Sequence, residues 1–339
     1  MGRMESKVLE NPIGKSVSWS ERHRRLIETV NPADVVAVMI SADPDALSSA
    51  LALRRLFWRK VKSVRIFRIN RIDRADNLAF VRLLDIRHSH VRSLRKADFT
   101  KFAIVDSQPS HHELFSGIDF NIVIDHHPAV DGLKADFIDI REDFGSNATL
   151  MTEYLKAGGI RPSQRLATAL LYGIKSDTNN FVRKTSTQDM IAFRYLFDLA
   201  NLNIIKKIES SDITRKTLGH IKKAIEELVF VKNVAVVHMG TVKNADILVI
   251  VADFFLRLAE AGWSIVSGVC GDKLVVIFRN AGFRRDAGKL ARDAFGEFGS
   301  AGGHKNAARA EIPLGALSSV VEKEAYGKFV VQRIRKASA

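Results

Sequence analysis

Cysteine, proline and long apolar runs are all scarce in this sequence. The single cysteine, Cys270, excludes an intrachain disulfide, and its apolar neighbours favour a buried structural thiol over a reactive one. No apolar run approaches the roughly 18 residues that cross a membrane, and the first twenty residues lack the apolar core of a secretory signal. These absences predict a cytoplasmic protein.

Acidic residues are outnumbered: 52 lysines and arginines accompany 38 aspartates and glutamates, for a formal net charge of +14. Clustered basic charge attracts phosphate groups, so the excess suggests a polyanionic partner. Part of it, namely Arg54, Arg55, Arg59 and Lys60, has the spacing of a solvated helix face. The net charge therefore does not identify a partner by itself.

Hydrophobic residues make up 46% of the 339 positions, as in an ordinary folded chain, and the length is sufficient for two domains. In the first half, short β-branched runs alternate with helical patterns, which predicts an α/β fold with a parallel sheet flanked by helices. We expect strands at 35–40, 64–69, 102–105 and 121–124, with helices at 46–58, 77–84, 148–155 and 167–174. Ligands of such open sheets bind beyond the carboxyl ends of the strands.

The second half begins with a segment, 187–228, whose pattern is helical almost throughout and predicts a helical connector. A second alternation of strands and helices follows, with strands expected at 230–238, 264–270, 274–279 and 308–312. A helix at 245–261, a glycine-rich turn at 299–304 and a terminal helix complete it. The chain is therefore expected to have a first lobe at 20–186, the connector at 187–228 and a smaller C-terminal α/β domain at 229–339.

Aspartates follow three of the expected strands. Asp43 and Asp45 come after 35–40, Asp106 after 102–105, and Asp125 with two histidines after 121–124, while Asp177 follows a helical run. Taken singly, each has an ordinary explanation: a helix N-cap, a turn, or surface histidines. Taken together, these carboxylates meet at one sheet edge, where they would repel one another unless protons or cations neutralise them. Oxygen ligands with one imidazole favour manganese or magnesium over zinc.

Five segments resemble the motifs of the DHH phosphoesterase family, and they occur in the family's order across roughly residues 35–315. Asp43-Pro-Asp45-Ala-Leu is similar to the first motif, Val105-Asp106 to the second, and Asp125-His126-His127-Pro128 to the motif that names the family. The segment 173–178, with Asp177, resembles the fourth. The segment 299–308, with Gly302, Gly303 and His304, resembles the signature of the DHH-associated C-terminal domain.

The resemblance implies a DHH catalytic domain at 20–186 and a substrate-binding domain at 229–339. One metal ion would be held by Asp45, Asp106, His126 and Asp177, and a second by Asp43 and the bridging Asp106. Asp106 and His127 would be catalytic, His127 facing the substrate phosphate. Two Mn²⁺ or Mg²⁺ ions would activate a water for in-line attack on phosphorus. The implied substrate-binding residues are His127, Arg279, Gly302, Gly303 and His304. Apart from the resemblance, Arg284 and Arg285 either widen the basic surface there or belong to a solvated loop.

Met39 departs from the family pattern, which usually has a histidine four residues before the position of Asp43. A thioether is a poor ligand for a hard cation, so Ser41 or water would have to substitute. The first glycine pair of the C-terminal signature is also altered, to Ser300 and Ala301.

Three functions therefore stay open. The first is a phosphoesterase for nucleotides or short oligonucleotides, such as nanoRNA, dinucleotides or 3′-phosphoadenosine 5′-phosphate. The second is a nucleotide-binding regulator with a degenerate first metal site, and the third a single-strand exonuclease. The sequence also leaves open whether the chain forms a homodimer.

Overall fold

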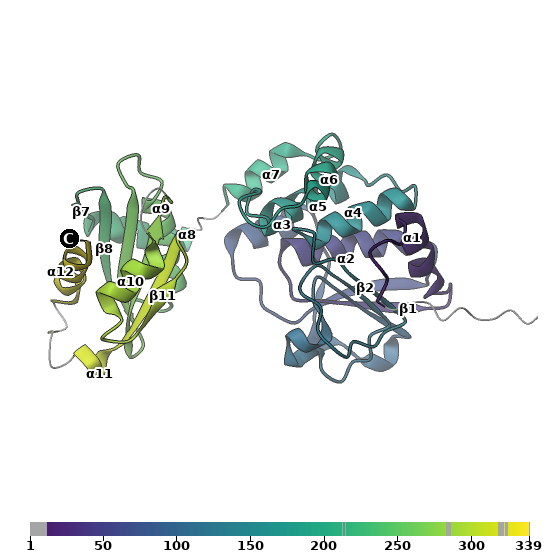
Figure 1. Cartoon of the computed structure of the whole chain (residues 1–339), viewed down its shortest axis with the longest axis horizontal. Coiled ribbons are helices and arrows are strands. Elements are labelled where there is room, and N and C mark those ends of the chain that lie inside the picture. The colour runs from purple at the N-terminus through teal and green to yellow at the C-terminus, as the bar shows by residue number, and fades with distance from the viewer. Residues whose placement is uncertain are drawn as a thin grey trace, which may run out of the picture. The chain divides into compact units, whose positions relative to one another are not determined.

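The computed structural model describes residues 12–211, 213, 215–282, 286–317, 322 and 325–338. The chain forms two compact units, residues 1–212 and residues 213–339, and each is described by itself (Figure 1). The segment 187–228, expected to be a helical connector, contains three helices among its described residues, and these are divided between the units. Its helices α6 (Thr187–Phe197) and α7 (Leu202–Glu209) belong to the first unit and α8 (Arg215–Glu226) to the second.

The first unit is built on a six-stranded sheet in which every pair of neighbours is parallel. The order is β3 (Ser89–His90), β2 (Ser63–Arg68), β1 (Val35–Ile40), β4 (Lys101–Val105), β5 (Ile122–Asp125) and β6 (Phe137–Ile140). The predicted α/β class is confirmed, and the four predicted strands are present within one residue at either end. The sequence analysis missed β3, which has two residues, and β6, whose apolar run is interrupted by the buried Asp139.

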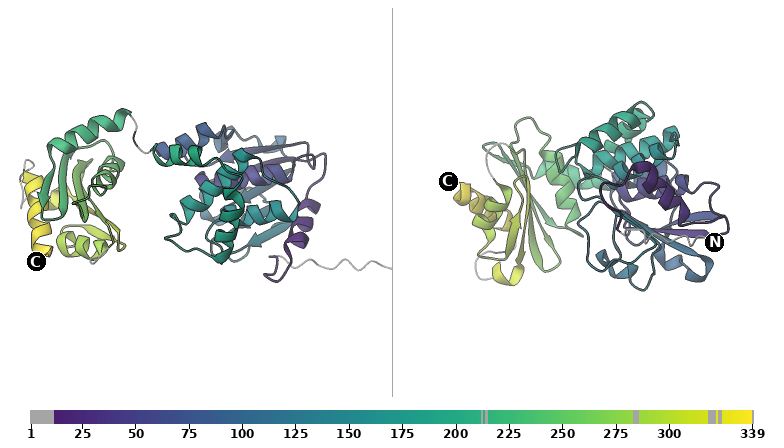
Figure 2. Two further views of the ribbon diagram at one scale, coloured as in Figure 1. Left: turned by 90° about the horizontal axis from the view of Figure 1, so that it is seen from above. Right: turned by 45° about the vertical axis from the view of Figure 1, so that its right-hand side comes forward.

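The two faces of this sheet are covered differently. Alternate residues of β1, such as Val36 and Val38, pack with the α-helices in one apolar cluster. Ala37 and Met39 point to the other face and pack with residues from loops and short 3₁₀ helices. Right-handed connections explain this, because the chain moves one way along the sheet from β1 to β3 and the opposite way from β4 to β6. The α-helices are α1 (Trp19–Glu28), α2 (Pro44–Leu56), α3 (Ala75–Leu83), α4 (Asn147–Ala157) and α5 (Gln164–Asp177), followed by α6 and α7 (Figure 2).

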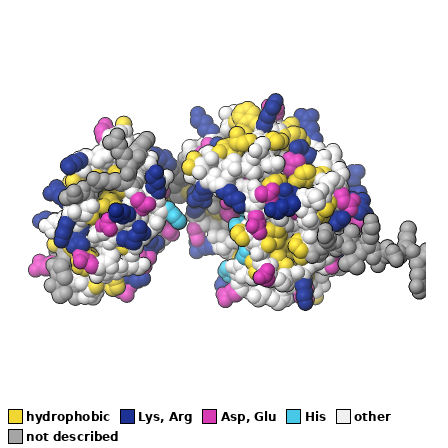
Figure 3. All heavy atoms as spheres, viewed as in Figure 1, with side chains coloured by type: hydrophobic (Ala, Val, Ile, Leu, Met, Phe, Trp, Pro, Cys, Tyr) yellow, Lys and Arg dark blue, Asp and Glu magenta, His cyan; other side chains and the backbone are white. Residues whose placement is uncertain are grey.

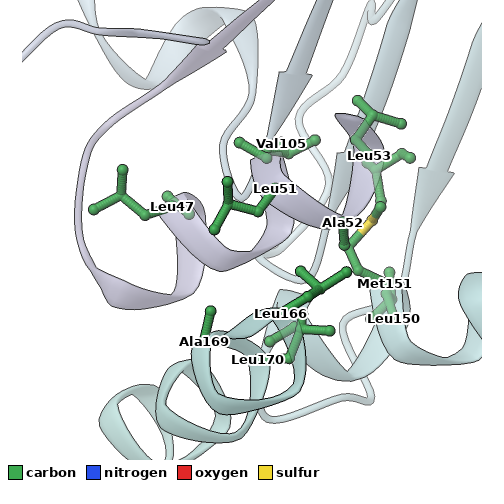
Figure 4. Close-up of a cluster of buried hydrophobic side chains, with 14 of the residues drawn as sticks. Leu47, Leu51, Ala52, Leu53, Val105, Leu150, Met151, Leu166, Ala169 and Leu170 are labelled. Atoms are coloured by element: carbon green, nitrogen blue, oxygen red, sulfur yellow. The ribbon is translucent and has the colours of Figure 1, made fainter. Parts of the chain in front are cut away.

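Helix α2 lies at the centre of this arrangement. Its residues Leu47, Leu51 and Leu53 are buried among side chains of β4, α4 and α5 (Figure 4). Gly173 of α5 permits the close approach, since a Cβ at that position would lie 2.5 Å from the hydroxyl oxygen of Ser48. The start of α2 is thereby fixed against both the sheet and the neighbouring helices.

The second unit has its own six-stranded sheet, which is antiparallel except for the pair β8 and β9. The order is β11 (Ser300–Gly303), β12 (Ala307–Pro313), β10 (Lys273–Asn280), β9 (Trp263–Cys270), β8 (Val234–Thr241) and β7 (Val229–Val231). Its helices are α8, α9 (Asp246–Phe255), α10 (Ala287–Phe295), α11 (Leu314–Leu317) and α12 (Tyr326–Ser338).

Two expectations for this unit were wrong in detail. The single strand expected at 230–238 is a hairpin of β7 and β8, which turns at Lys232 with a left-handed φ of 57°. The glycine-rich segment 299–304 is largely the edge strand β11, because Ser300–Gly303 pairs along β12. Across the described parts of both units, no helix is long and apolar enough to cross a membrane.

Candidate metal centre

The sheet order places three acidic strand ends together. Strands β2 and β3 extend from β1 in one direction, and β5 and β6 extend from β4 in the other. Crevices form beyond the carboxyl ends of strands at such a reversal and commonly hold ligands. Asp43 and Asp45 follow β1, and Asp106 follows β4, so they border this position.

His126 lies among three of the carboxylates. Its Nδ1 lies 3.3 Å from the carbonyl oxygen of Phe144, to which it can donate its proton, so that Nε2 keeps a free lone pair. Nε2 lies 3.2 Å from Asp177 Oδ2, 3.3 Å from Asp106 Oδ1 and 3.9 Å from Asp45 Oδ2. Yet Nε2 and Asp106 Oδ1 are both buried without a hydrogen-bond partner. Lone pairs that converge in this way suit a cation, so the residues present fit a divalent metal.

Asp45 is fixed by the start of helix α4. Its two carboxylate oxygens accept hydrogen bonds from the backbone N–H groups of Asn147 and Ala148, each at 2.7 Å. Ser146 caps the same helix by accepting a hydrogen bond from Thr149. The helix expected at 148–155 is confirmed as α4. The contact of its first residues with Asp45 was missed, because nothing local in the sequence links residues about a hundred positions apart.

The carboxylates of this centre carry a high electrostatic cost. Burial raises the pKa of Asp106 well above its usual range, and the charges of Asp43, Asp125 and Asp177 raise it further. Burial also raises the pKa of Asp45, with Asp106 and Asp177 adding to the effect. The pKa of Asp43 is raised by burial, although the carboxylate accepts a hydrogen bond from Ala46 as the N-cap of α2. A bound cation would remove this cost.

Asp125 differs from its neighbours, because it orients a histidine. Burial alone would raise its pKa, but His127 and Gln108 hydrogen-bond the carboxylate and bring the pKa below its usual value. Its Oδ1 lies 2.8 Å from Nδ1 of His127. With Nδ1 engaged, the other nitrogen of His127, a side chain 45% exposed, is left free for a ligand.

Gln108 holds Asp125 in place and was missed by the sequence analysis. Its side chain is fully buried and donates to Asp125 Oδ2 at 2.7 Å and to the carbonyl oxygen of Pro128 at 2.9 Å. Its own oxygen accepts from the backbone of Val130. The only available signal was its position two residues after Asp106, which is too weak to identify a role.

The structure therefore brings together Asp45, Asp106, His126 and Asp177, with Asp43 close enough for its charge to affect Asp106. Met39, at the expected histidine position, is fully buried in the apolar cluster that includes Phe67 and Ile104. A hydrophobic side chain is compatible with that location.

The substrate-binding residues expected in the second unit lie near the ends of β10 and β11. Nε of Arg279 donates to Asp253 Oδ1 at 2.6 Å. Gly303 has a φ of 149°, and a Cβ there would lie 2.4 Å from the carbonyl oxygen of Ala307, so this position requires glycine. Gly302 belongs to β11, and His304 is exposed. Arg284 and Arg285 lie outside the described residues.

Residues 35–174, which contain β1 to β6 and the acidic strand ends, match the N-terminal domain of the DHH family. The first unit therefore contains the N-terminal domain of the DHH family. Of the five motifs that carried the resemblance, three lie wholly within the matched residues, the fourth, at 173–178, begins there, and the fifth, at 299–308, lies outside them.

Sequence relatives extend the similarity beyond the DHH domain. An uncharacterised protein of Methanocaldococcus jannaschii is 35% identical over 302 residues, which cover 89% of this chain and 62% of that protein. An A-adding tRNA nucleotidyltransferase of Geobacter sulfurreducens is 26% identical over 300 residues, 82% of this chain and 32% of the enzyme. The chain thus spans less than two thirds of the length of either relative.

A solved structure shows the same fold. The crystal structure of an exopolyphosphatase-related protein from Bacteroides fragilis superposes with a TM-score of 0.63 at 16% sequence identity, covering 96% of this chain and 98% of that chain. At 16% sequence identity, this similarity shows that the two chains share a fold, and it does not identify a substrate.

Proposed function

We propose that this DHH protein is a divalent-metal-dependent phosphoesterase that hydrolyses nucleotide phosphates or short oligonucleotides. The observation that carries the proposal is that Nε2 of His126 and Oδ1 of Asp106 are both buried without a hydrogen-bond partner and lie 3.3 Å apart, with Asp177 Oδ2 3.2 Å from the same nitrogen. Manganese or magnesium suits this set of oxygen ligands with one imidazole. When bound, such ions lower the pKa of a water and neutralise charge on a phosphate.

The residues around the metal centre have distinct proposed roles. Asp45, Asp106, His126 and Asp177 are proposed as ligands of one ion, and Asp43 with the bridging Asp106 as ligands of the other. Asp125 holds His127 through Nδ1, and we propose that the free nitrogen of His127 contacts the substrate phosphate. The low pKa of Asp125 keeps that carboxylate charged, so that it can accept the Nδ1–H hydrogen bond that orients the His127 ring.

The second unit is proposed to bind the nucleotide part of the substrate. Arg279 can offer a bidentate guanidinium to phosphate, and Gly302 and Gly303 can present backbone N–H groups, with His304 beside them. The net charge of +14 and the similarity to a tRNA nucleotidyltransferase support a ligand of the nucleotide class.

Release of p-nitrophenol from bis-(p-nitrophenyl) phosphate tests the activity, with Asp106→Ala as the inactive control. We expect manganese-dependent release by the wild type only. A panel of short oligonucleotides, dinucleotides and 3′-phosphoadenosine 5′-phosphate then identifies the substrate. Oligomers of about two to five nucleotides should be cut faster than long strands if the second unit caps a chain end, whereas equal rates would indicate a single-strand exonuclease.

A second candidate, a nucleotide-binding regulator, is favoured by the apolar environment of Met39, which supplies no imidazole to the first metal site. This function predicts nucleotide binding without release of p-nitrophenol above that of Asp106→Ala. The Met39→His variant helps to distinguish the phosphoesterase from the regulator. If position 39 adjoins the metal, the added imidazole should let activity reach its maximum at a lower manganese concentration.

A further inference from the structure

A cavity of about 650 Å³ lies in the first unit, away from the metal centre. It is formed by the end of α2 and the loop after it, the beginning of β2 and the beginning of α5. Helix α2 starts beside Asp45 and ends at this cavity, and α5 starts at the cavity and ends at Asp177. With a rise of 1.5 Å per residue, the 13 residues of α2 separate the two places by about 20 Å.

The lining of this cavity is basic. Its 13 residues include five arginines and lysines, and none is acidic; the basic ones are Arg54, Arg55, Arg59, Lys62 and Arg165. Figure 3 shows acidic side chains interspersed with lysine and arginine over the visible faces of the units, so a lining without any acid is a local feature. The nearby carboxylate of Asp85 is shared, at 3.6 Å from Arg165 and 3.8 Å from Arg87.

This positive charge is incompletely compensated. Arg54 is half-buried, and burial together with the charges of Arg165 and Arg87 lowers its pKa. Like charges held this close attract an anion with several negative groups, such as a phosphodiester chain.

An exposed aromatic ring accompanies the charge. Trp58 lines the cavity and is 64% exposed, a large fraction for an apolar side chain of this size. Arg59 beside it has a left-handed φ of 61°, so the chain turns sharply immediately after the tryptophan. An exposed indole among arginines is the combination that binds unpaired bases, with the ring stacking on a base and the guanidinium groups pairing with phosphates.

We propose that this cavity binds single-stranded nucleic acid, with a base stacked on Trp58 and the phosphates paired with Arg55, Arg59 and Lys62. A paired base cannot stack on the indole, so a duplex should bind more weakly. A strand held here leaves the metal centre free, because the two sites lie at opposite ends of α2. The protein could therefore hold a long strand while a short fragment occupies the metal centre. Binding at the cavity does not depend on hydrolysis.

Tryptophan fluorescence tests the stacking directly. The full chain is titrated, without metal, with an unlabelled single strand of about 12 nucleotides, a length within the range of known single-strand sites. We expect quenching in the wild type. Trp58→Phe should lose most of the quenching but keep the affinity measured by anisotropy with a labelled strand, because phenylalanine also stacks. Unchanged quenching in Trp58→Phe would place the strand elsewhere and overturn the proposal.

Anisotropy of a labelled strand tests the contribution of each group. Trp58→Ala should weaken binding about tenfold, the effect of losing one stacked base. The pair Arg55→Glu and Arg59→Glu should weaken it at least as much and reduce the slope of log K against log salt by about 1.4, for two lost phosphate contacts. The matched control, Lys206→Glu with Lys207→Glu, changes the charge equally at two exposed positions of α7 and should leave affinity within about twofold.

Competition identifies the ligand class. A duplex of the same sequence and inorganic polyphosphate should both displace the strand poorly. If polyphosphate competes as well as the strand and Trp58→Ala binds normally, the surface attracts charge alone and the proposal is wrong. Asp106→Asn should bind the strand like the wild type, so that a failure of the proposed hydrolysis and a failure of this binding site remain distinguishable.

Discussion

The pKa values of the aspartates at the metal centre shift in different directions because their hydrogen-bond partners and nearby charges differ. Asp125 has hydrogen-bond donors on both oxygens, and its pKa falls despite burial. Asp106 has an oxygen without a partner, and its pKa is raised by burial and then by the charges of three nearby carboxylates. One carboxylate thus orients a histidine, while the other is suited to a cation.

Asp106→Asn should stabilise the metal-free protein near neutral pH. The pKa of Asp106 is raised above its ordinary value of 3.8, so its protonated form contributes stability that is fully present below about 3.8 and is lost as the pH rises through the higher pKa of the folded state. Asparagine cannot ionise and avoids this loss. Thermal unfolding without metal should give a higher Tm for Asp106→Asn near neutral pH, by roughly 2 to 4 °C per kcal/mol, and the difference should shrink toward pH 4.

Manganese provides the control for that comparison. A ligand at 100 times its dissociation constant stabilises a protein by about 2.7 kcal/mol. Saturating manganese should therefore raise the Tm of the wild type and leave Asp106→Asn almost unchanged. A variant that is less stable than the wild type without metal would show that Asp106 supports the fold.

At the scale of elements, helix α1 is attached to the sheet by a buried ionic network. Arg22 of α1 is fully buried and pairs with the buried Asp139 of β6, which also accepts a hydrogen bond from Tyr154 of α4. The guanidinium further donates to the carbonyl oxygens of Gly14 and Val17. Removing one partner of such a network leaves a charge buried and uncompensated.

Arg22→Leu should lower the free energy of unfolding by about 3 to 5 kcal/mol, as measured by urea denaturation. Arg24→Leu on the same helix is the matched control. Arg24 pairs with Glu21 and Glu28 on the surface, so its loss should cost less than about 1 kcal/mol. The double variant Arg22→Met with Asp139→Leu should recover most of the stability. Similar costs for Arg22→Leu and Arg24→Leu would mean that the network does not hold α1.

Elements with a strong local pattern could be predicted from the sequence. Strand β1 is a continuous apolar run followed by Asp43, and both its limits and its acidic end were predicted. The contacts that give these residues their properties join distant segments. Asp45 depends on α4 and Asp125 on Gln108, and no local pattern encodes either pairing. The hairpin of β7 and β8 was missed because both strands are apolar and only Lys232 and Asn233 separate them.

At the scale of the whole molecule, the proposal assigns the chemical step to the first unit and nucleotide binding to the second. Arg279→Ala should weaken binding of nucleotide substrates by tens to thousands of fold, since losing a desolvated charge-assisted pair costs about 2 to 5 kcal/mol. Slow cleavage of bis-(p-nitrophenyl) phosphate should be nearly unchanged, because this small ester reports on the metals alone.

Asp253→Asn is the control for Arg279. It removes the ion pair of Arg279 in the free protein but keeps the guanidinium, so nucleotide affinity should be retained or increased. Equal losses in Arg279→Ala and Asp253→Asn would assign a structural role to the pair. Equal losses on both substrates in Arg279→Ala would contradict the division of work between the units.

Calorimetric titration of the metal-free protein with manganese tests the metal centre most directly. The proposed ligand set predicts that the wild type takes up two ions per chain and that Asp106→Ala loses both, because this carboxylate bridges them. Two intact sites in the variant would contradict the bridging role of Asp106. No manganese uptake by the wild type would contradict the metal centre itself.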